Sequence, residues 1–362
     1  MGSHGGGRGR IIWKIWIFVS LMCSALLHEA LCQDGGGHNH EHQPPMNPCQ
    51  FGRSNFLYCQ CDPESDTLSE VTDAKCWLGQ HLKPQRHSKE WEAISRLTSL
   101  TSLEFYMRDK ELKFFVPRIV FQRMFNLSYF MLKMAEIDSL PSFAFTNSSS
   151  IRELVLESND IRLLKPNAFA NMESLTILNL RSNLLLEINR DVFVNLPSLE
   201  KLYLDQNQIR FIHDRALAHL FNLQELDLHS NNLTTLTPEV FTNLTKLRSL
   251  DLRSNYIDFL GEAVFAEMPM LEEVDLTRNR IISIHPAAFA GLKGLTRLTL
   301  KDNKIVRLDS RTFEGLHRLY FLDLRQNELE TLDEELVAPI YDKLRDVSTQ
   351  LFIEGKLYTQ HL

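Results

Sequence analysis

An asparagine recurs at a constant spacing of 24 residues along this chain. It occurs eight times without a gap, at Asn159, Asn183, Asn207, Asn231, Asn255, Asn279, Asn303 and Asn327. Each copy is preceded by leucine or a similar residue in the frame L-x-x-L-x-L-x-x-N, as by Leu199, Leu202 and Leu204. So regular a spacing indicates stacked copies of one structural unit, and it constrains the fold more than composition does.

Two further features extend the repeat. Ten residues after each of the first seven asparagines comes a large apolar residue: Phe169, Phe193, Leu217, Phe241, Phe265, Phe289 and Phe313. Upstream, two weaker copies keep the leucine frame but place Ala135 and Arg108 where the asparagine is due. We therefore expect about ten repeats over residues 97–340, two of them degenerate.

Each position that recurs in the repeat has a physical role. The L-x-L triplet predicts a short strand whose leucines point inward while the intervening residue points outward. A buried asparagine can satisfy the backbone groups left open where the chain turns out of that strand. The phenylalanine is expected to form a second apolar column beneath the opposite wall. One copy cannot bury its own apolar face, so neighbouring copies must stack.

This pattern resembles the 24-residue leucine-rich repeats of extracellular proteins. The resemblance implies an α/β solenoid, a horseshoe with a parallel sheet on its concave side and a cysteine cap at its N-terminal end. One solenoid would replace the two or three globular domains that 362 residues otherwise suggest. At the other end, Leu351 stands where the next asparagine is due, so residues 341–362 are expected to form a tail or an atypical cap.

The cysteines indicate an oxidising compartment. Two of the six, Cys23 and Cys32, fall in the predicted signal peptide, and the other four lie between positions 49 and 76. A clustered, even set in a secreted chain predicts disulfides over residues 49–96, whereas zinc would need two ligand pairs at metal spacing. Spacing alone leaves three pairings open. Resemblance to the N-terminal cap of extracellular leucine-rich-repeat proteins implies Cys49 with Cys61 and Cys59 with Cys76.

The N-terminus predicts secretion. Residues 1–32 combine basic residues with the apolar run Ile15–Leu27, which is typical of a signal peptide cleaved before Gln33, although cleavage after Ala30 or an uncleaved anchor is an alternative. Residues 33–48 are expected to be a flexible linker, although their histidines at 38, 40 and 42 could bind a transition metal weakly. No other stretch is apolar enough for a transmembrane helix. We expect the protein to be secreted or to lie on the extracellular face of the plasma membrane.

The outward positions of the concave strands divide the repeats into two parts. In the C-terminal half, acidic residues alternate with basic ones such as Arg253 and Arg325, so the pairs are expected to neutralise each other. The N-terminal half is apolar, and such a patch favours a protein partner. The alternative is that the cap or the linker covers the patch. The predicted ligand-binding residues are Tyr129, Met131, Met134, Val155, Ile177 and Tyr203.

Four N-x-S/T sequons predict glycosylation in a secreted chain. They begin at Asn126, Asn147, Asn232 and Asn243. None falls on an outward position of a predicted concave strand, so this face is expected to remain free for a protein.

Other functions are disfavoured. The formal net charge of −7 argues against a generic nucleic-acid-binding protein. No nucleophile elbow, zinc-protease motif, P-loop or dinucleotide-binding motif occurs in the sequence. We therefore predict no enzyme, no cofactor and no metal, with an extracellular or cell-surface protein as partner.

The cap and the repeats together resemble the insect connectin group. The residues that carry this resemblance are Cys49, the run Tyr58-Cys59-Gln60-Cys61 and Cys76-Trp77, followed by degenerate and then regular repeats. The resemblance implies cell-surface adhesion, including binding to a second copy, in neuromuscular or axonal targeting. It also implies a lipid anchor, whose signal would require a C-terminus longer than the sequence here. The alternative is a secreted ligand-binding or innate-immune protein, or a decoy resembling a Toll-type ectodomain.

Overall fold

The computed structural model describes residues 47–50, 57–64, 67–79, 89–107, 118–121, 123–145, 148–331, 336 and 350–353. The predicted signal peptide and nearly all of the predicted linker lie outside the described residues. No helix in the described part of the chain is long and apolar enough to cross a membrane.

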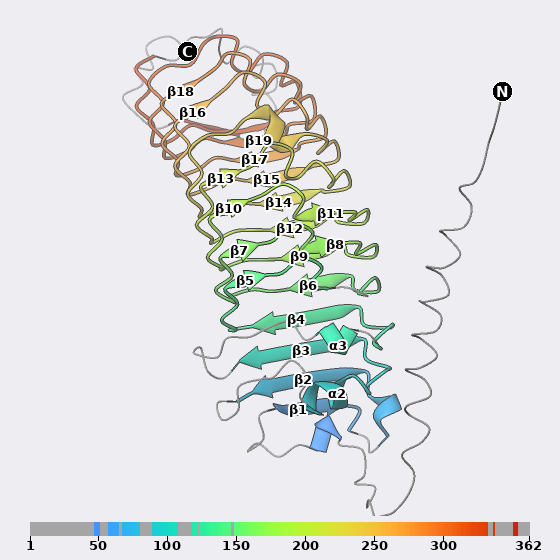
Figure 1. The fold of residues 1–362 in the computed structure, drawn as a ribbon. Helices are drawn as coiled ribbons and strands as arrows, with labels where there is room; N and C mark the ends of the chain where they lie inside the picture. Colours follow the sequence, from blue (N-terminus) through green and yellow to red (C-terminus); the bar gives the residue numbers. More distant parts are fainter. Residues whose placement is uncertain are drawn as a thin grey trace, which may run out of the picture. The chain divides into compact units, whose positions relative to one another are not determined.

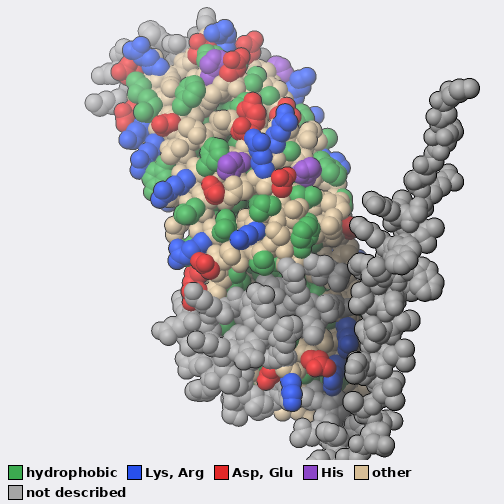
Figure 2. Space-filling view, viewed as in Figure 1, with side chains coloured by type: hydrophobic (Ala, Val, Ile, Leu, Met, Phe, Trp, Pro, Cys, Tyr) green, Lys and Arg blue, Asp and Glu red, His purple; other side chains and the backbone are tan. Residues whose placement is uncertain are grey.

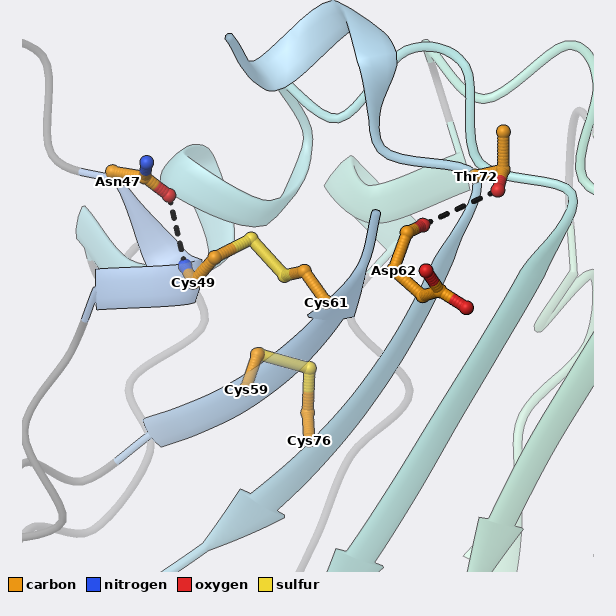
Figure 3. The surroundings of a disulfide bond; sticks show 7 residues. All are labelled: Asn47, Cys49, Cys59, Cys61, Asp62, Thr72 and Cys76. Atoms are coloured by element: carbon orange, nitrogen blue, oxygen red, sulfur yellow. Dashed lines mark hydrogen bonds between the residues drawn. A yellow bond between two sulfur atoms is a disulfide. The ribbon is translucent and has the colours of Figure 1, made fainter. Parts of the chain in front are cut away.

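The N-terminal cap is a disulfide-linked hairpin. Strands β1 (Leu57–Asp62) and β2 (Asp73–Leu78) pair antiparallel, and the disulfide between Cys59 and Cys76 joins facing residues whose Cα atoms are 4.0 Å apart. A second disulfide, between Cys49 and Cys61, ties the 3-10 turn η1 (Pro48–Gln50) to β1 (Figure 3). This is the pairing that the family resemblance implies.

Three short helical elements accompany the cap and the first repeats. The 3-10 turn η2 (Leu68–Glu70) connects β1 to β2. Helix α2 (Lys89–Ile94) buries Trp91 against the first repeat, where its ring meets Phe105 edge to face at 5.7 Å. Helix α3 is the single turn Arg118–Phe121. The cap thus covers the apolar end that a stack of repeats would otherwise expose.

The repeats form one large sheet. Within the described residues it contains thirteen strands, and from β2 onward every neighbouring pair is parallel and in sequence order (Figure 1). Each of the ten predicted repeats supplies one strand, because its L-x-L triplet pairs with the triplets before and after it. The repeat strands are β3 (Ser102–Met107), β4 (Tyr129–Lys133), β6 (Glu153–Val155), β9 (Ile177–Asn179), β12 (Lys201–Tyr203), β14 (Glu225–Asp227), β15 (Ser249–Asp251), β17 (Glu273–Asp275), β19 (Arg297–Thr299) and β20 (Phe321–Asp323).

The opposite wall contains turns and two-residue strands rather than long helices. Its short parallel pairs are β5 (Ser139–Leu140) with β7 (Leu163–Leu164), β8 (Phe169–Ala170) with β11 (Phe193–Val194), β10 (Glu187–Ile188) with β13 (Phe211–Ile212) and β16 (Phe259–Leu260) with β18 (Ser283–Ile284). A 3-10 turn, η3 (Pro238–Phe241), takes this place in one repeat. The described solenoid therefore contains little helix. It is the α/β solenoid that the repeat implies, with the parallel sheet as its main element.

Two columns of side chains fill the space between the walls. The strand leucines are fully or almost fully buried, and so are the phenylalanines of the opposite wall. Phe145, Phe169 and Phe193 stack with centroids 5.8–5.9 Å apart, and a second run joins Phe241 to Phe313. Leu217 separates the two runs. The predicted apolar columns are confirmed.

The asparagines have the predicted role and together form a ladder of hydrogen bonds along the repeats. Asn207 Nδ2 donates to the carbonyl of Leu204 in its own repeat and to that of Leu180 in the previous one, both at 3.0 Å. Its Oδ1 accepts from the backbone N–H of Leu185 at 3.0 Å. The residue before each asparagine has a positive φ, as Gln206 does at 55°. The side-chain amide thus satisfies the groups that this sharp turn leaves unpaired.

The C-terminal tail adds a strand. β21 (Gln350–Phe352) pairs parallel with β20, and Leu351 lies opposite Leu322. Leu351 is thus a strand leucine, 29 residues after its counterpart, and does not occupy an asparagine position. This extra strand covers the edge that β20 would otherwise expose.

Candidate protein-binding face

The outward residues of the large sheet align in three columns. In β12 they are Lys201, Tyr203 and Asp205, which alternate with the buried Leu202 and Leu204. Because the strands are in register, the equivalent residues of each repeat lie beside them. We call this surface the sheet face, and its columns first, second and third in the order of these three residues.

An aromatic stack begins the third column. Tyr58, Trp77 and Tyr106 come from β1, β2 and β3 and lie opposite one another in the sheet. Their ring centroids are 5.7 and 5.9 Å apart with interplanar angles of 30° and 17°, and all three are half-buried. Sequence reasoning missed this stack. One signal for it is present in the sequence: Tyr58 directly precedes Cys59, and Trp77 directly follows Cys76, the disulfide partner of Cys59.

Five of the six predicted ligand-binding residues lie on the sheet face. Met131 and Val155 are neighbours in the second column but are only 5% and 6% exposed. Tyr129, Ile177 and Tyr203 are half-buried and retain accessible surface. The structure therefore places five of the predicted residues on one face, where Met131 and Val155 are almost buried and the other three remain accessible.

Met134 does not belong to this face, contrary to the expectation. β4 ends at Lys133, and Met134 follows it with a φ of 63° and an exposed fraction of 52%. Its backbone N–H donates to the carbonyl of Ser158, which has the same turn conformation one repeat later. The alternation of the strand ends at this turn, so Met134 is not part of the columns to which Tyr129, Met131 and Lys133 belong.

Charged pairs occupy much of the remaining face. Lys133 lies 2.9 Å from Glu157, and Lys201 lies 2.9 Å from Glu225. Arg253 binds Asp251 at 2.7 Å and Arg325 binds Asp323 at 2.5 Å, so the predicted neutralisation is present. Figure 2 shows acidic and basic side chains interspersed over the described repeats.

At the C-terminal end of the sheet face, two arginine guanidinium groups lie over aromatic rings. The Arg297 guanidinium lies 4.0 Å from the centroid of Phe321, and that of Arg325 lies 4.6 Å from the centroid of Phe352. Phe352 belongs to the tail strand, so the repeat frame could not place it on this face.

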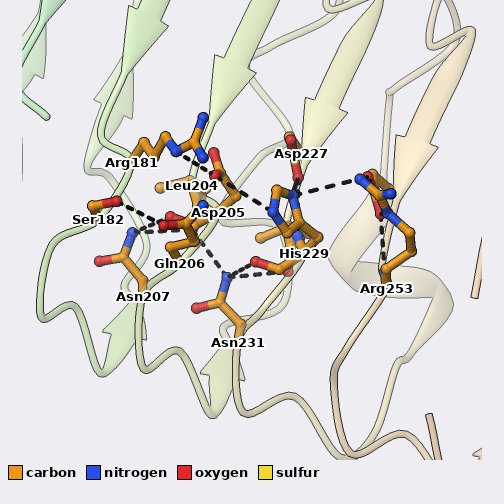
Figure 4. A network of polar contacts seen from close by, with 12 residues as sticks. Arg181, Ser182, Leu204, Asp205, Gln206, Asn207, Asp227, His229, Asn231 and Arg253 are labelled. Carbon is orange, nitrogen blue, oxygen red and sulfur yellow. Dashed lines mark hydrogen bonds and ion pairs between the residues drawn. The ribbon is translucent and has the colours of Figure 1, made fainter. Parts of the chain in front are cut away.

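A buried acid lies near the centre of the sheet face. Asp205 is 1% exposed, with its Oδ2 atom 3.0 Å from Arg181 Nε and 3.7 Å from His229 Nε2. His229 Nδ1 lies 2.7 Å from Asp227 Oδ1 (Figure 4). Burial, followed by the negative charge of Asp227, raises the pKa of Asp205 to about 6.

Burial raises the pKa of three tyrosines on this face, most strongly at Tyr106 and Tyr129 and in the same direction at Tyr203. Burial, followed by its hydrogen bond to Glu104, raises the pKa of Tyr106 to about 12. Burial, followed by the charge of Glu104, raises the pKa of Tyr129 to about 12. Both phenols therefore stay neutral hydrogen-bond donors throughout the physiological range.

Three of the predicted glycosylation sites are described. Asn126 and Asn243 are exposed and Asn232 is half-buried. Asn243 Nδ2 donates to the carbonyl of Ala218 at 3.2 Å. None of the three lies in a column of the sheet face, whereas Asn147 lies outside the described residues.

Comparison with solved structures shows similar folds. A chain of the TLR13–ssRNA13 complex has a TM-score of 0.58 at 24% identity, and this chain spans about a third (34%) of it. The Leptospira interrogans protein LIC12759 has a TM-score of 0.57 at 27% identity over 69% of this chain and 60% of that one. A chain of the octameric complex of Latrophilin 3, Unc5D and FLRT2 has a TM-score of 0.57 at 23% identity over 72% of this chain and 78% of that one. The Toll–Spatzle complex of Drosophila contains a chain with a TM-score of 0.55 at 24% identity over 71% of this chain and 38% of that one.

No curated protein matches the sequence. The family described as "Leucine rich repeat" does, over residues 125–185, 173–233, 221–281 and 269–329, which together span more than half of the chain. The chain belongs to the leucine-rich repeat family.

Proposed function

We propose that this protein is a non-enzymatic extracellular recognition protein that binds a protein partner through its sheet face. The observation that carries the proposal is the run of aromatic and apolar side chains at the N-terminal end of that face. It comprises the stacked Tyr58, Trp77 and Tyr106 together with Tyr129, Ile177 and Tyr203. Glu104 and Glu153 are interspersed among these side chains.

The chemistry of this run suits a protein interface. Tyrosine, tryptophan and methionine are enriched at interface centres because they bury large areas at low entropic cost. Here the tyrosines are held before binding: Tyr106 donates to Glu104 at 2.7 Å, and the Tyr129 hydroxyl lies 3.6 Å from Met131 Sδ. Such preorganisation lowers the entropy that a complex must lose.

The charged pairs further along the face have a different role in this proposal. Arg253 is already bound to Asp251, and Arg325 to Asp323, so a partner gains little by contacting them. They would select a complementary partner and tune its association rate, which depends on salt.

The setting in which recognition occurs is also part of the proposal. Two disulfides in the cap, the signal-like N-terminus and three sequons away from the sheet face support an extracellular location. Two structural neighbours come from complexes with other proteins, one of FLRT2 with Unc5D and Latrophilin 3 and one of Toll with Spatzle. Together with the resemblance to the connectin group, these features favour cell-surface adhesion.

The binding site can be tested by comparing two double variants. Tyr129→Ala with Tyr203→Ala should weaken cell aggregation or ligand capture tenfold or more, because truncated aromatic anchors typically cost about 2 kcal/mol or more. Asp275→Ala with Arg253→Ala is the matched control on the same face, and it should alter mainly the salt dependence. Both must unfold at temperatures near that of the parent chain. The opposite ranking, or no effect from either pair, would contradict binding at the apolar end.

A second candidate is a secreted ligand-binding protein of innate immunity, which the likeness to the Toll and TLR13 chains favours. A mixed-cell assay separates the two. Aggregation of expressing cells with one another indicates homophilic adhesion, whereas binding of the purified chain to a soluble ligand without aggregation favours the second candidate.

A further inference from the structure

We propose that Asn232 carries an N-linked glycan whose first sugar packs against the ring of Tyr256, and that this glycan covers a row of exposed apolar side chains on one side of the solenoid. The row lies outside the columns of the sheet face. The proposal rests on the extracellular location proposed above, because a chain acquires N-linked glycans on its way to secretion. It does not depend on which partner the sheet face binds.

Exposed apolar side chains recur on one side of the solenoid, after the asparagine ladder and before the opposite wall. They come from five of the six successive repeats that begin at Asn159 and end with the repeat of Asn279, and they are 39–54% exposed: Leu163, Leu186, Phe211, Tyr256, Phe259 and Ile282. Three of them lie in β7, β13 and β16, which follow one another along that side (Figure 1). Charged residues such as Arg210 and Asp258 stand between some of them. We call the six residues the apolar row, and surface of this kind ordinarily has a cover or a partner.

The sixth repeat, which contributes no residue to the row, contains a sequon at the same place. Asn232 is the counterpart of Tyr256 one repeat earlier, and Phe211 and Phe259 belong to the repeats on either side. Asn232 is half-buried, and Thr234, the hydroxyl residue of the sequon, is exposed. A glycan on Asn232 would therefore emerge in the middle of the apolar row.

Tyr256 is held beside Asn232 by both of its neighbouring repeats. Its backbone N–H donates to the carbonyl of Leu233, the residue after Asn232, at 2.8 Å. On the other side, the guanidinium of Arg280 from the following repeat lies 4.3 Å from the centroid of the tyrosine ring. Arg280 thus supports the ring from the repeat away from Asn232, while 39% of Tyr256 stays exposed. That exposed surface is available to a sugar on Asn232.

The ring suits the first sugar of an N-linked glycan. N-acetylglucosamine presents several C–H bonds on one face of its ring, and these are attracted to the negative face of an aromatic ring. Neighbouring strands are about 4.8 Å apart, so a tyrosine one repeat away lies within reach of a sugar joined to the asparagine. The remaining sugars are polar, and they would extend over the apolar row while keeping their hydroxyl groups in water.

The sequon at Asn243 provides a matched control because it lacks such a ring. Its counterparts in the previous and following repeats are His219 and Glu267, and its Nδ2 atom donates to the carbonyl of Ala218 at 3.2 Å. A glycan there would lie on the opposite wall, away from Tyr256.

The test uses the full chain secreted from eukaryotic cells. Mass spectrometry of glycopeptides should find Asn232 occupied. Asn232→Gln and Thr234→Ala each remove the sequon, and both should lower the unfolding temperature by roughly 2 °C, the shift expected for one aromatic contact in a chain of this size. Both should also increase binding of a fluorescent dye that reports exposed apolar surface. Asn243→Gln should leave dye binding unchanged.

Tyr256→Ala then identifies the ring as the contact. In a chain that already carries this substitution, Asn232→Gln should lower the unfolding temperature no further, whereas Asn243→Gln should have the same effect with and without the ring. The proposal is overturned if Asn232 is bare in the secreted chain, or if Asn232→Gln has the same effect with and without Tyr256. A chain that is not secreted would overturn the extracellular location as well, whereas a secreted chain with a bare Asn232 would overturn this proposal alone.

Discussion

The side-chain amide of Asn207 donates to the carbonyl of Leu180, 27 residues earlier, at 3.0 Å. This bond joins two consecutive repeats, and equivalent bonds recur along the ladder, such as that from Asn255 to Leu228. The ladder therefore adds side-chain hydrogen bonds to the backbone hydrogen bonds of the sheet that already join successive repeats.

Replacing Asn207 with alanine should destabilise the chain by about 1–3 kcal/mol, because it leaves the N–H of Leu185 unpaired in the core. The carbonyls of Leu180 and Leu204 each lose one of two donors and keep the amide of Asn183 or Asn231. Denaturant unfolding followed by circular dichroism measures the loss. Gln208→Ala, at an exposed neighbouring position, is the control and should stay near the parent value. Equal midpoints for both variants would argue against a structural ladder.

The phenylalanine column makes a graded prediction. Phe265 stacks between Phe241 and Phe289 at 6.2 and 5.8 Å, and Leu217 occupies the same position two repeats earlier. Phe265→Ala should cost about 3–5 kcal/mol through the cavity it leaves. Phe265→Leu should cost distinctly less, since this architecture already accommodates a leucine there. Thermal unfolding of both variants provides the comparison, and equal losses would contradict it.

Reduction should loosen the cap before the repeats. The two disulfides close loops with sequence separations of 12 and 17, for which chain entropy predicts about 3 kcal/mol each. We expect hydrogen exchange to rise first in β1 and β2, while β14 and β15 stay protected by neighbours on both sides. Exchange measured by mass spectrometry with and without reductant tests this. Unchanged exchange in the cap would mean that the disulfides contribute little.

Alkaline pH should destabilise the N-terminal repeats. The pKa of both Tyr106 and Tyr129 is raised to about 12 in the folded chain, so the folded state holds these protons more tightly than the unfolded state. Their contribution is complete below about pH 10, the ordinary tyrosine pKa, and is lost as the pH rises towards about 12. Tyr106→Phe should flatten this decline in unfolding free energy, while lowering stability at neutral pH through loss of its bond to Glu104. A decline as steep as that of the parent chain would contradict the assignment.

Much of the fold could be predicted because the repeat relates every residue to its counterpart 24 positions away. Once Leu202 is known to be a strand leucine, Leu226 must lie beside it, and the structure pairs them. The same logic placed Tyr129 and Tyr203 on one face. It failed at Met134, where the alternation of the strand gives way to a left-handed turn that the frame alone does not mark.

The sequence by itself determined the period, the buried columns, the asparagine ladder and the two kinds of residue on the sheet face, because contacts between identical units follow from the spacing alone. Only the tertiary structure decided the stacking of Tyr58 on Trp77, the addition of β21 and the burial of Asp205 beside His229. The first two features involve the cap and the tail, which lie outside the repeat. The strand register of these segments depends on connecting loops whose lengths do not follow the 24-residue period. The burial of Asp205 depends on how different side chains pack against one another within one column. A periodic pattern specifies the position of each side chain on the face, but it does not specify how far the neighbouring side chains cover it.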